Sequence, residues 1–305
     1  MRIAVFGARG QLGAAVTEEC APLHDTTTFA RADLDIADER GVLEAMSRLR
    51  PDAIVNGIAY TDVDGAEDHA IEALNANAFA VRTLARAAAA VGAVLVHYST
   101  DFVFDGKADA PYTEADRPNP RSVYAASKLL GEWFANDAPR SYVLRVETLF
   151  GRTETGPVPR GSVANIVNAL TAGGNPKVFE DRTVSPTYLA DAARATRLLL
   201  ESLPPAGLYH CVNSGHATWL EFASELARRL GGDALVAKLV PVRMADVKLR
   251  AIRPQFCALA NAKLRSAGIE MPAWQDALAR YLSGGVASAL HRVSVLQNDR
   301  GSERR

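Results

Sequence analysis

Tyr124 and Lys128 are the residues whose types and spacing most clearly suggest chemistry. On a helix, residues four positions apart lie on the same face, one turn from each other. A nearby ammonium favours the phenolate, so Lys128 is expected to lower the pKa of Tyr124 from its ordinary value of about 10. A phenol tuned in this way suits the reduction of a carbonyl group. This spacing is common on helices, so the pair alone does not establish a catalytic site. The segments around it must show whether a cofactor and further catalytic groups are present.

A glycine-rich loop near the N-terminus could supply the cofactor for this chemistry. Residues 2–6 form an apolar run typical of a strand buried on both faces, residues 7–13 read Gly-Ala-Arg-Gly-Gln-Leu-Gly, and a helix pattern follows. Glycines in this order permit a tight turn and let the backbone approach a pyrophosphate at the helix N-terminus. The spacing is Gly-x-x-Gly-x-x-Gly rather than Gly-x-Gly-x-x-Gly, and a glycine-rich turn without a ligand is the alternative.

Strand and helix patterns alternate through the chain, which predicts an α/β fold: a Rossmann-type doubly wound parallel sheet. In such a sheet the binding crevice lies at the carboxyl ends of the strands. The expected strands are 2–6, 26–30, 52–57, 94–98 and 142–146, and the expected later helices include 39–49, 70–90 and 188–202.

The end of the second expected strand bears on the choice of cofactor. An acidic residue at this place selects a free 2′-hydroxyl, whereas an arginine tolerates a 2′-phosphate. Arg31 therefore favours NADPH, but an arginine on the surface needs no such role, and both NADPH and NADH stay open.

Composition excludes several classes of protein. The chain has 305 residues, 48% of them hydrophobic, enough for one large α/β domain or for one domain with a smaller companion. A net charge of −1, with no basic run before the last few residues, argues against a nucleic-acid partner. Three widely spaced cysteines argue against a disulfide framework or zinc knuckle. With no leader and no apolar run of about 18 residues, we expect a cytoplasmic protein without a membrane partner.

Taken together, these segments resemble the extended short-chain dehydrogenase/reductases, and among them the dTDP-4-dehydrorhamnose reductases. The resemblance covers roughly residues 1–283 and is most specific over 97–132. The segments that carry it are 7–13, 33–36, 55–67, 97–106, 111–114, 123–132, 185–187, 207–210 and 253–254.

The resemblance implies catalytic roles for Thr100, Tyr124 and Lys128. Two aimed hydroxyls, on Tyr124 and Thr100, would stabilise the charge that builds on a ketone oxygen during hydride transfer. Tyr124 would then donate its proton as the general acid, while Lys128 would hold the nicotinamide ribose. Without the other residues, Thr100 would read as a hydroxyl that caps backbone at a strand end. The expected cofactor contacts are Gly7, Arg9, Gly10, Gln11, Leu12, Gly13, Arg31, Asp35, Ile36, Ile58, Ala59, Thr61, Tyr124 and Lys128.

The expected substrate contacts follow from the same resemblance. They are Asp101, Phe102, Thr148, Arg182 and Arg253. A guanidinium suits a phosphate, so Arg253 and, less clearly, Arg182 are assigned to a nucleotide diphosphate; an exposed or capping arginine is the alternative for each. Asp101 could equally cap the following turn. Thr148 stands where the family usually carries an aromatic residue, which leaves the sugar open.

The chain is expected to divide into two folded parts and an extension. Residues 1–151 and 177–205 would form the dinucleotide-binding domain, and residues 152–176 and 206–283 a smaller α+β substrate-binding part. Residues 284–305 are expected to add a short helix and a frayed polar end.

No metal site is predicted. The histidines have no metal-ligand spacing. Some family members bind magnesium between subunits through an acidic residue just past the glycine loop, where this chain has Ala14 and Ala15. A homodimer is left open.

The leading hypothesis is an NAD(P)H-dependent reductase of a nucleotide-linked 4-keto-6-deoxy sugar, specifically one that converts dTDP-4-dehydrorhamnose to dTDP-L-rhamnose. A sugar-nucleotide epimerase or dehydratase of the same fold is one alternative, and a non-catalytic dinucleotide-binding regulatory subunit is another. The complete set of Thr100, Tyr124 and Lys128 argues against a pure binder, which needs no acid.

Overall fold

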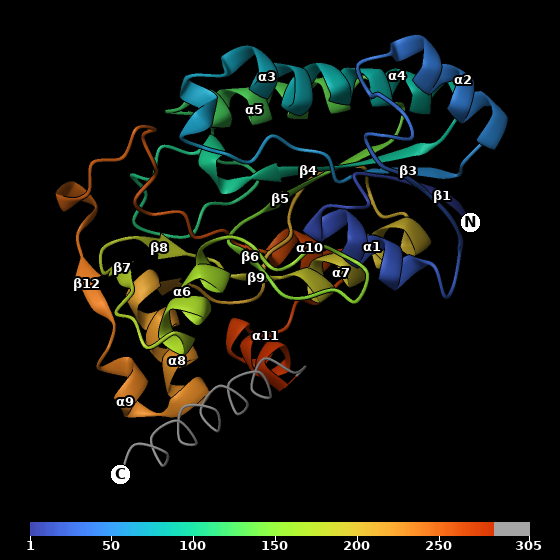
Figure 1. Cartoon of the computed structure of the whole chain (residues 1–305). Coiled ribbons are helices and arrows are strands. Elements are labelled where there is room, and N and C mark those ends of the chain that lie inside the picture. The colour runs from blue at the N-terminus through green and yellow to red at the C-terminus, as the bar shows by residue number, and fades with distance from the viewer. Residues whose placement is uncertain (284–305) are drawn as a thin grey trace.

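A computed structural model describes residues 1–283. The protein is built on a six-stranded parallel sheet (Figure 1). The strand order is β10-β5-β4-β3-β1-β2, and every neighbouring pair is parallel. This order is the doubly wound arrangement predicted from the alternation of patterns. The strands are β1 (Arg2–Phe6), β2 (Asp25–Phe29), β3 (Ala53–Asn56), β4 (Val94–Thr100), β5 (Ser141–Val146) and β10 (Gly207–His210).

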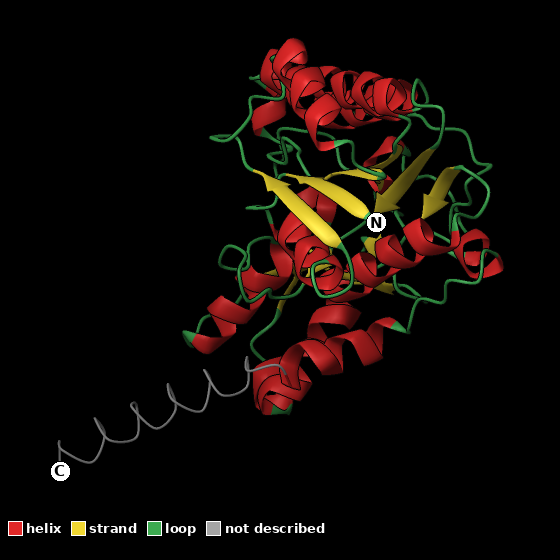
Figure 2. Ribbon diagram, turned by 90° about the vertical axis from the view of Figure 1, so that its right-hand side faces the viewer, coloured by secondary structure: helices red, strands yellow, loops and turns green. Residues whose placement is uncertain are grey.

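Helices cover both faces of this sheet (Figures 1 and 2). On one face α1 (Gln11–Cys20) packs against α7 (Leu189–Ser202). On the other, α4 (Ala80–Val91) lies between α2 (Glu39–Leu49) and α5 (Val123–Ala135). Each face has its own apolar core, which explains why β1, β3 and β5 read as continuous apolar runs rather than alternating ones. No helix in residues 1–283 is long and apolar enough to cross a membrane.

The helix expected at residues 70–90 is divided. It consists of α3 (Ala70–Leu74), a π-helical turn η2 (Asn75–Phe79) and α4. At the end of η2 the Ala80 amide bonds back to the Asn75 carbonyl, one residue further than in an α-helix. The wider turn buries Asn77 completely against its neighbours.

A further apolar core lies in the smaller part of the molecule, below the sheet in Figure 1. It is built on aromatic side chains of α8 (Trp219–Gly231) and α11 (Trp274–Tyr281), together with α6 (Ser162–Thr171). A capping box of Thr218 and Glu221 fixes the start of α8. The other elements are β6 (Leu149–Phe150), β7 (Lys177–Phe179), β8 (Thr183–Val184), β9 (Thr187–Tyr188), β11 (Ala217–Thr218), β12 (Val240–Val242), α9 (Asp233–Val236), α10 (Ala262–Ser266), η1 (Gly65–Glu67), η3 (Asp101–Val103) and η4 (Met244–Asp246).

The predicted boundary at residue 206 is wrong in one respect. Residues 207–210, assigned to the substrate-binding part, form β10 and pair with β5 in the central sheet. The side chains of Leu264, Ile269 and Met271 also pack into the core beneath that sheet, with α1 and α7. Residues 207–210 therefore stay with the central sheet, and the chain comes back to the core beneath it at residues 264–271. The helix predicted within 284–305 lies outside the described residues, and the rest of the division remains a prediction.

Candidate active site

The glycine loop closes tightly over the end of β1. Gly7 has a φ of +75°, and its amide donates to the Phe29 carbonyl at 3.0 Å. A Cβ at Gly13 would lie 2.3 Å from the Gly7 carbonyl oxygen, and one at Gly7 would lie 2.8 Å from the backbone of Gly57. These contacts require glycine. No side chain caps the N-terminus of α1, which leaves a helix end suited to a pyrophosphate.

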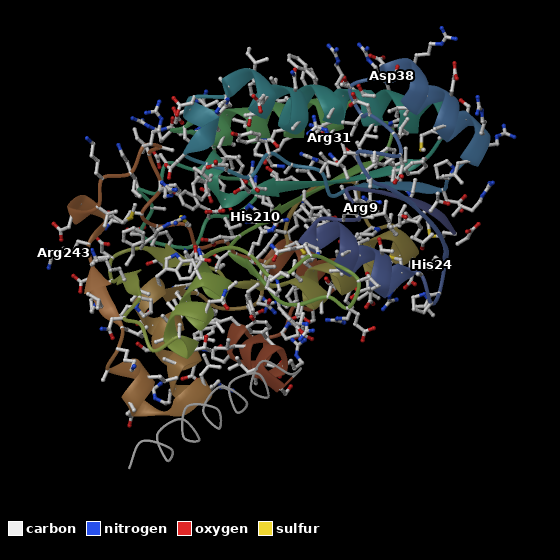
Figure 3. The ribbon with its side chains drawn as sticks, viewed as in Figure 1. Arg9, His24, Arg31, Asp38, His210 and Arg243 are labelled. Atoms are coloured by element: carbon white, nitrogen blue, oxygen red, sulfur yellow. The ribbon has the colours of Figure 1, made fainter. Side chains whose placement is uncertain are left out.

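The remaining predicted cofactor residues in this region lie around the loop. Arg9, just before α1, and Arg31, just after β2, are exposed (Figure 3). Asp35 is exposed as well. The Gln11 side chain is already bonded: its Oε1 accepts from the Arg160 amide at 2.7 Å. This bond ties the segment after β6 to the start of α1.

Other members of the predicted set differ in how far their side chains are exposed. Leu12 is buried in the core on one face of the sheet, and Ile36 packs partly against the core on the opposite face. Ile58 is half-buried, whereas Ala59 and Thr61 are exposed in the loop after β3. This loop follows the carboxyl edge of the sheet, where the fold places its ligands.

Tyr124 and Lys128 lie in the first half of α5, which Ser122 caps by accepting the Ala125 amide. Lys128 is buried, and its Nζ donates to the Tyr98 carbonyl at 2.5 Å. Burial lowers the pKa of Lys128 to about 8. Burial also raises the pKa of the Tyr124 phenol to about 12, opposed by a hydrogen bond from Thr100. The prediction that Lys128 lowers the pKa of Tyr124 is therefore wrong for this structure, because burial raises that pKa and the group that opposes the rise is Thr100.

Thr100 ends β4 beside Tyr124. Its Oγ1 donates to Asp101 Oδ1 at 2.9 Å and accepts from the Phe102 amide at 3.3 Å. Thr100 therefore caps the turn η3, as its alternative interpretation held, and also contacts the phenol. The Phe102 ring meets the Tyr124 ring edge-on at 5.6 Å between centroids. The Arg182 guanidinium lies 5.2 Å from the Phe102 ring centre, so three predicted substrate residues gather beside the phenol.

Two residues that the sequence analysis did not single out hold this helix in place. Asn77 Nδ2 donates to Ser127 Oγ at 2.9 Å and to the Tyr60 carbonyl at 3.1 Å. Ser127 Oγ in turn donates to the Tyr124 carbonyl at 2.8 Å. A Cβ at Gly131 would lie 2.1 Å from the Asn77 carbonyl oxygen, so α5 and the π-turn touch through backbone. The available signal was an amide side chain within an alanine-rich helix pattern.

A buried ion pair fixes the next turn of α5. Arg145 on β5 donates from Nε and Nη2 to the two carboxylate oxygens of Glu132, each at 2.8 Å. Ser99 Oγ donates to the same carboxylate at 2.5 Å. Glu132 follows Lys128 by four residues, so both side chains lie on the same face of α5. The bonds of Glu132 to Arg145 and Ser99 therefore hold this face of the helix against β5 and β4.

The two remaining predicted substrate residues have different surroundings. Arg253 donates from both terminal nitrogens to Asp64, at 2.9 and 2.8 Å, and these bonds lower the pKa of Asp64 to about 2. The arginine assigned to a diphosphate is thus paired with a carboxylate from the cofactor domain. Thr148 follows β5 with a φ of +43°, a strained value for a β-branched residue.

The fold and this site define a short-chain dehydrogenase/reductase, because a Rossmann sheet brings a glycine loop, a strand-end threonine and a Tyr-x-x-x-Lys helix to one edge. The family model for the RmlD substrate binding domain matches residues 1–286. The chain belongs to that family, the dTDP-4-dehydrorhamnose reductases.

Individual relatives agree with this assignment. The dTDP-4-dehydrorhamnose reductase of Streptomyces griseus is 35% identical, over 90% of this chain and 90% of that protein. The enzyme of that name from Escherichia coli K12 is 34% identical, over 93% and 97%. The dTDP-4-dehydrorhamnose reductase of Bacillus anthracis, solved in complex with NADP, is 31% identical with a TM-score of 0.86, covering 93% of this chain and 99% of that one. The family and the fold predicted from the sequence are thereby confirmed.

Proposed function

We propose that this chain reduces dTDP-4-dehydrorhamnose to dTDP-L-rhamnose with NADPH or NADH. The observation that carries the proposal is the placement of Thr100, Tyr124 and Lys128 at the sheet edge next to the glycine loop. Relatives that span nearly the whole chain carry the name of this activity. NADPH is the first cofactor to test, because a relative of 31% identity was solved with NADP.

The residues of this chain fit such a dinucleotide. The uncapped start of α1 and the glycines that touch at Gly7 and Gly13 suit a pyrophosphate held by backbone amides. Bound NADPH would supply the hydride. Lys128, whose ammonium donates to the Tyr98 carbonyl, has two further N–H donors, and one of them would bind the nicotinamide ribose. Exposed Arg31 is available to a 2′-phosphate.

Tyr124 is the proposed general acid. Its pKa of about 12 keeps the phenol protonated at neutral pH, ready to give its proton to the ketone oxygen as negative charge develops. The Thr100 hydroxyl, whose one proton goes to Asp101 in this structure, would turn that proton to the ketone oxygen or to the phenolate that remains and stabilise the charge there. The phenolate is then reprotonated for the next cycle.

The proposed substrate contacts are Asp101, Phe102 and Arg182 beside the phenol, with Thr148 and Arg253 farther along the edge. Arg253 would have to leave Asp64, or be shared with it, to reach a diphosphate. We also propose a cytoplasmic location, which the three free, buried cysteines support, and keep a homodimer as a prediction.

The test is a cofactor oxidation assay. Purified protein mixed with dTDP-4-dehydrorhamnose and NADPH is expected to consume the cofactor in proportion to the sugar. No oxidation of either NADPH or NADH, with this or related keto-sugar nucleotides, would refute the proposal. Conversion of a sugar nucleotide without net cofactor consumption would indicate an epimerase or dehydratase, and dinucleotide binding with no turnover would indicate a regulatory subunit.

A further inference from the structure

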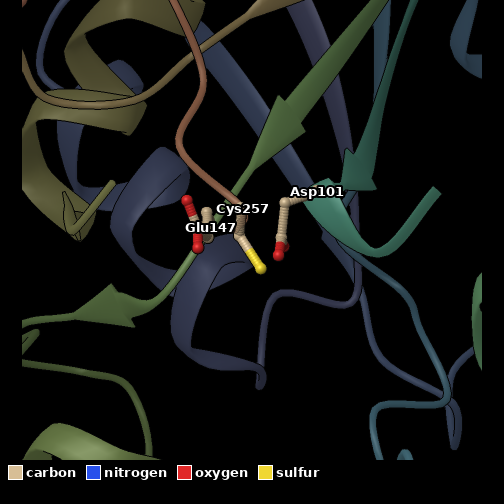
Figure 4. A group of neighbouring side chains, drawn as sticks. All are labelled: Asp101, Glu147 and Cys257. Carbon is tan, nitrogen blue, oxygen red and sulfur yellow. The ribbon is translucent and has the colours of Figure 1, made fainter. Parts of the chain in front are cut away.

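A second group of ionisable side chains lies buried beside the proposed acid. Asp101 follows β4, Glu147 follows β5, and Cys257 comes from the segment after Arg253; one ligand atom of each lies within 4.8 Å of the other two. Figure 4 shows the three side chains converging from these separate segments. Both acids are buried: Asp101 is 2% exposed and Glu147 is 3% exposed.

The hydrogen bonds of this group are incomplete. Glu147 Oε2 accepts from the Ser185 amide at 2.6 Å, and Asp101 Oδ1 accepts from Thr100. The other oxygens, Glu147 Oε1 and Asp101 Oδ2, are buried and have no hydrogen-bond partner within residues 1–283. A buried carboxylate oxygen without a donor is costly while its group is charged, and protonation of one carboxyl group removes that charge.

The charges lead to the same conclusion. Arg182 supplies one positive charge near both carboxyl groups, and its Nη2 donates to Cys257 Sγ at 3.6 Å. The Cys257 thiol donates to the Pro254 carbonyl, and burial raises its pKa well above the ordinary range, so it adds no charge. Two carboxylates against one guanidinium would leave an unbalanced buried charge. One proton on the carboxyl pair removes it.

Burial raises the pKa of Glu147 well above its ordinary 4.5, and the charge of Asp101 raises it further. The pKa of Asp101 is also raised by burial, but Arg182 and the Thr100 hydroxyl oppose that shift. Glu147 is therefore the better place for the proton, and Asp101 for the charge.

We propose that Glu147 is a positioning residue that carries a proton at neutral pH, and that its neutral carboxyl group leaves Asp101 as the one carboxylate beside Arg182, where Asp101 stays the acceptor of the Thr100 hydroxyl. A carboxyl oxygen of Glu147 lies within 4.8 Å of one of Asp101, Asp101 accepts from Thr100, and Thr100 lies beside Tyr124. Loss of the proton would set two carboxylates against each other and add negative charge near the phenol, which raises the pKa of Tyr124 and weakens it as an acid. The catalytic part of this inference rests on the proposed function.

The test compares Glu147→Gln with Glu147→Ala. Glutamine is close in shape to a protonated glutamate, it can accept from the Ser185 amide, and it places no charge beside Asp101. We expect Glu147→Gln to keep kcat within about threefold of the wild type at pH 7, and Glu147→Ala to lose about tenfold or more. The matched control is Glu154→Gln, the same change at an exposed position seven residues later, which should leave the activity unchanged.

A second measurement reports the proton without using activity. A folded-state pKa above 4.5 means that the folded protein binds the proton more tightly, so wild-type stability should fall as the pH rises from about 4.5 through the raised pKa. The thermal unfolding temperature of Glu147→Gln, measured relative to that of the wild type, should therefore increase as the pH rises. The unfolding temperature of Glu154→Gln should change with pH in the same way as that of the wild type.

Several outcomes would overturn this inference. They are failure of Glu147→Gln to fold, loss of activity in Glu147→Gln as large as in Glu147→Ala, unchanged activity in both, or a constant stability difference between Glu147→Gln and wild type across the pH range. A wild-type protein that reduces no keto-sugar would instead refute the proposed function and the positioning role, while the stability comparison would still show whether Glu147 holds the proton.

Discussion

At the scale of single residues, Tyr124 is the group that must give up a proton. Tyr124→Phe keeps the ring that packs against Phe102 but removes the hydroxyl. Because general acids contribute about 10²- to 10⁴-fold to the rate, kcat should fall by at least about 10²-fold. Titration of NADPH fluorescence should show nearly normal cofactor binding. A variant that turns over at close to the wild-type rate would contradict the assignment of Tyr124.

Lys128 makes stability depend on pH. Its pKa is lowered from 10.5 to about 8, so between these values the unfolded chain binds a proton that the folded protein has lost. Stability should therefore rise with pH across this window, by at most about 1.4 kcal/mol per pH unit, and stop changing below about pH 8, where both states carry the proton. Chemical denaturation at several pH values should show this slope in the wild type but not in Lys128→Met. Parallel curves for the two proteins would contradict the lowered pKa.

The identities of Thr100, Tyr124 and Lys128 could be predicted from the sequence, but the direction of the Tyr124 pKa shift could not. Spacing along a helix places two side chains on one face. It does not show that the Tyr98 carbonyl, on β4, binds the ammonium, or that burial dominates the pKa of the phenol. Glu147 was missed because its environment comes from segments that meet only in the folded chain.

At the scale of elements, the close contact between α5 and the π-turn should be sensitive to one methyl group. In Gly131→Ala the new Cβ would meet the Asn77 carbonyl at 2.1 Å, and backbone cannot move aside cheaply. We expect a loss of about 1–3 kcal/mol in the free energy of unfolding, measured in urea, together with lower activity.

The control for this prediction is Gly231→Ala, also in a helix. There the new Cβ would lie 2.8 Å from Leu235 Cδ1, the movable end of a side chain. Its stability should change little or increase, since alanine is the better helix former by about 1 kcal/mol. Equal free energies of unfolding for Gly131→Ala and Gly231→Ala would contradict a close contact between Gly131 and the Asn77 carbonyl.

Element patterns predicted most of the sheet and helices, including α2 at residues 39–49. They did not predict the π-turn at 75–79, because its wider hydrogen bonding depends on where Asn77 finds partners in Tyr60 and Ser127. They also left β10 in the wrong part of the molecule. A four-residue strand does not reveal which sheet it joins, and β10 pairs with β5, some sixty residues earlier in the chain.

At the scale of the whole molecule, Asp64 and Arg253 join the loop after β3 to the C-terminal segment, and Arg250 pairs with Asp68 beside them. If Arg253 also binds a diphosphate, Arg253→Ala should raise the KM for the nucleotide sugar about tenfold or more. Asp64→Ala frees the guanidinium and should leave that KM unchanged or lower it. Equal increases in KM for both variants would show that the pair only joins the two segments.

The central claim is that a hydride passes from the cofactor to the sugar at the Tyr124 site. The most direct measurement uses NADPH carrying transferable deuterium at C4 of the nicotinamide, with dTDP-4-dehydrorhamnose and the wild-type protein, followed by mass spectrometry of the sugar nucleotide. We predict that each NADP⁺ formed is matched by one dTDP-L-rhamnose that carries the deuterium, and that Tyr124→Phe forms neither. A sugar nucleotide converted without deuterium, or with the cofactor left reduced, would contradict the account.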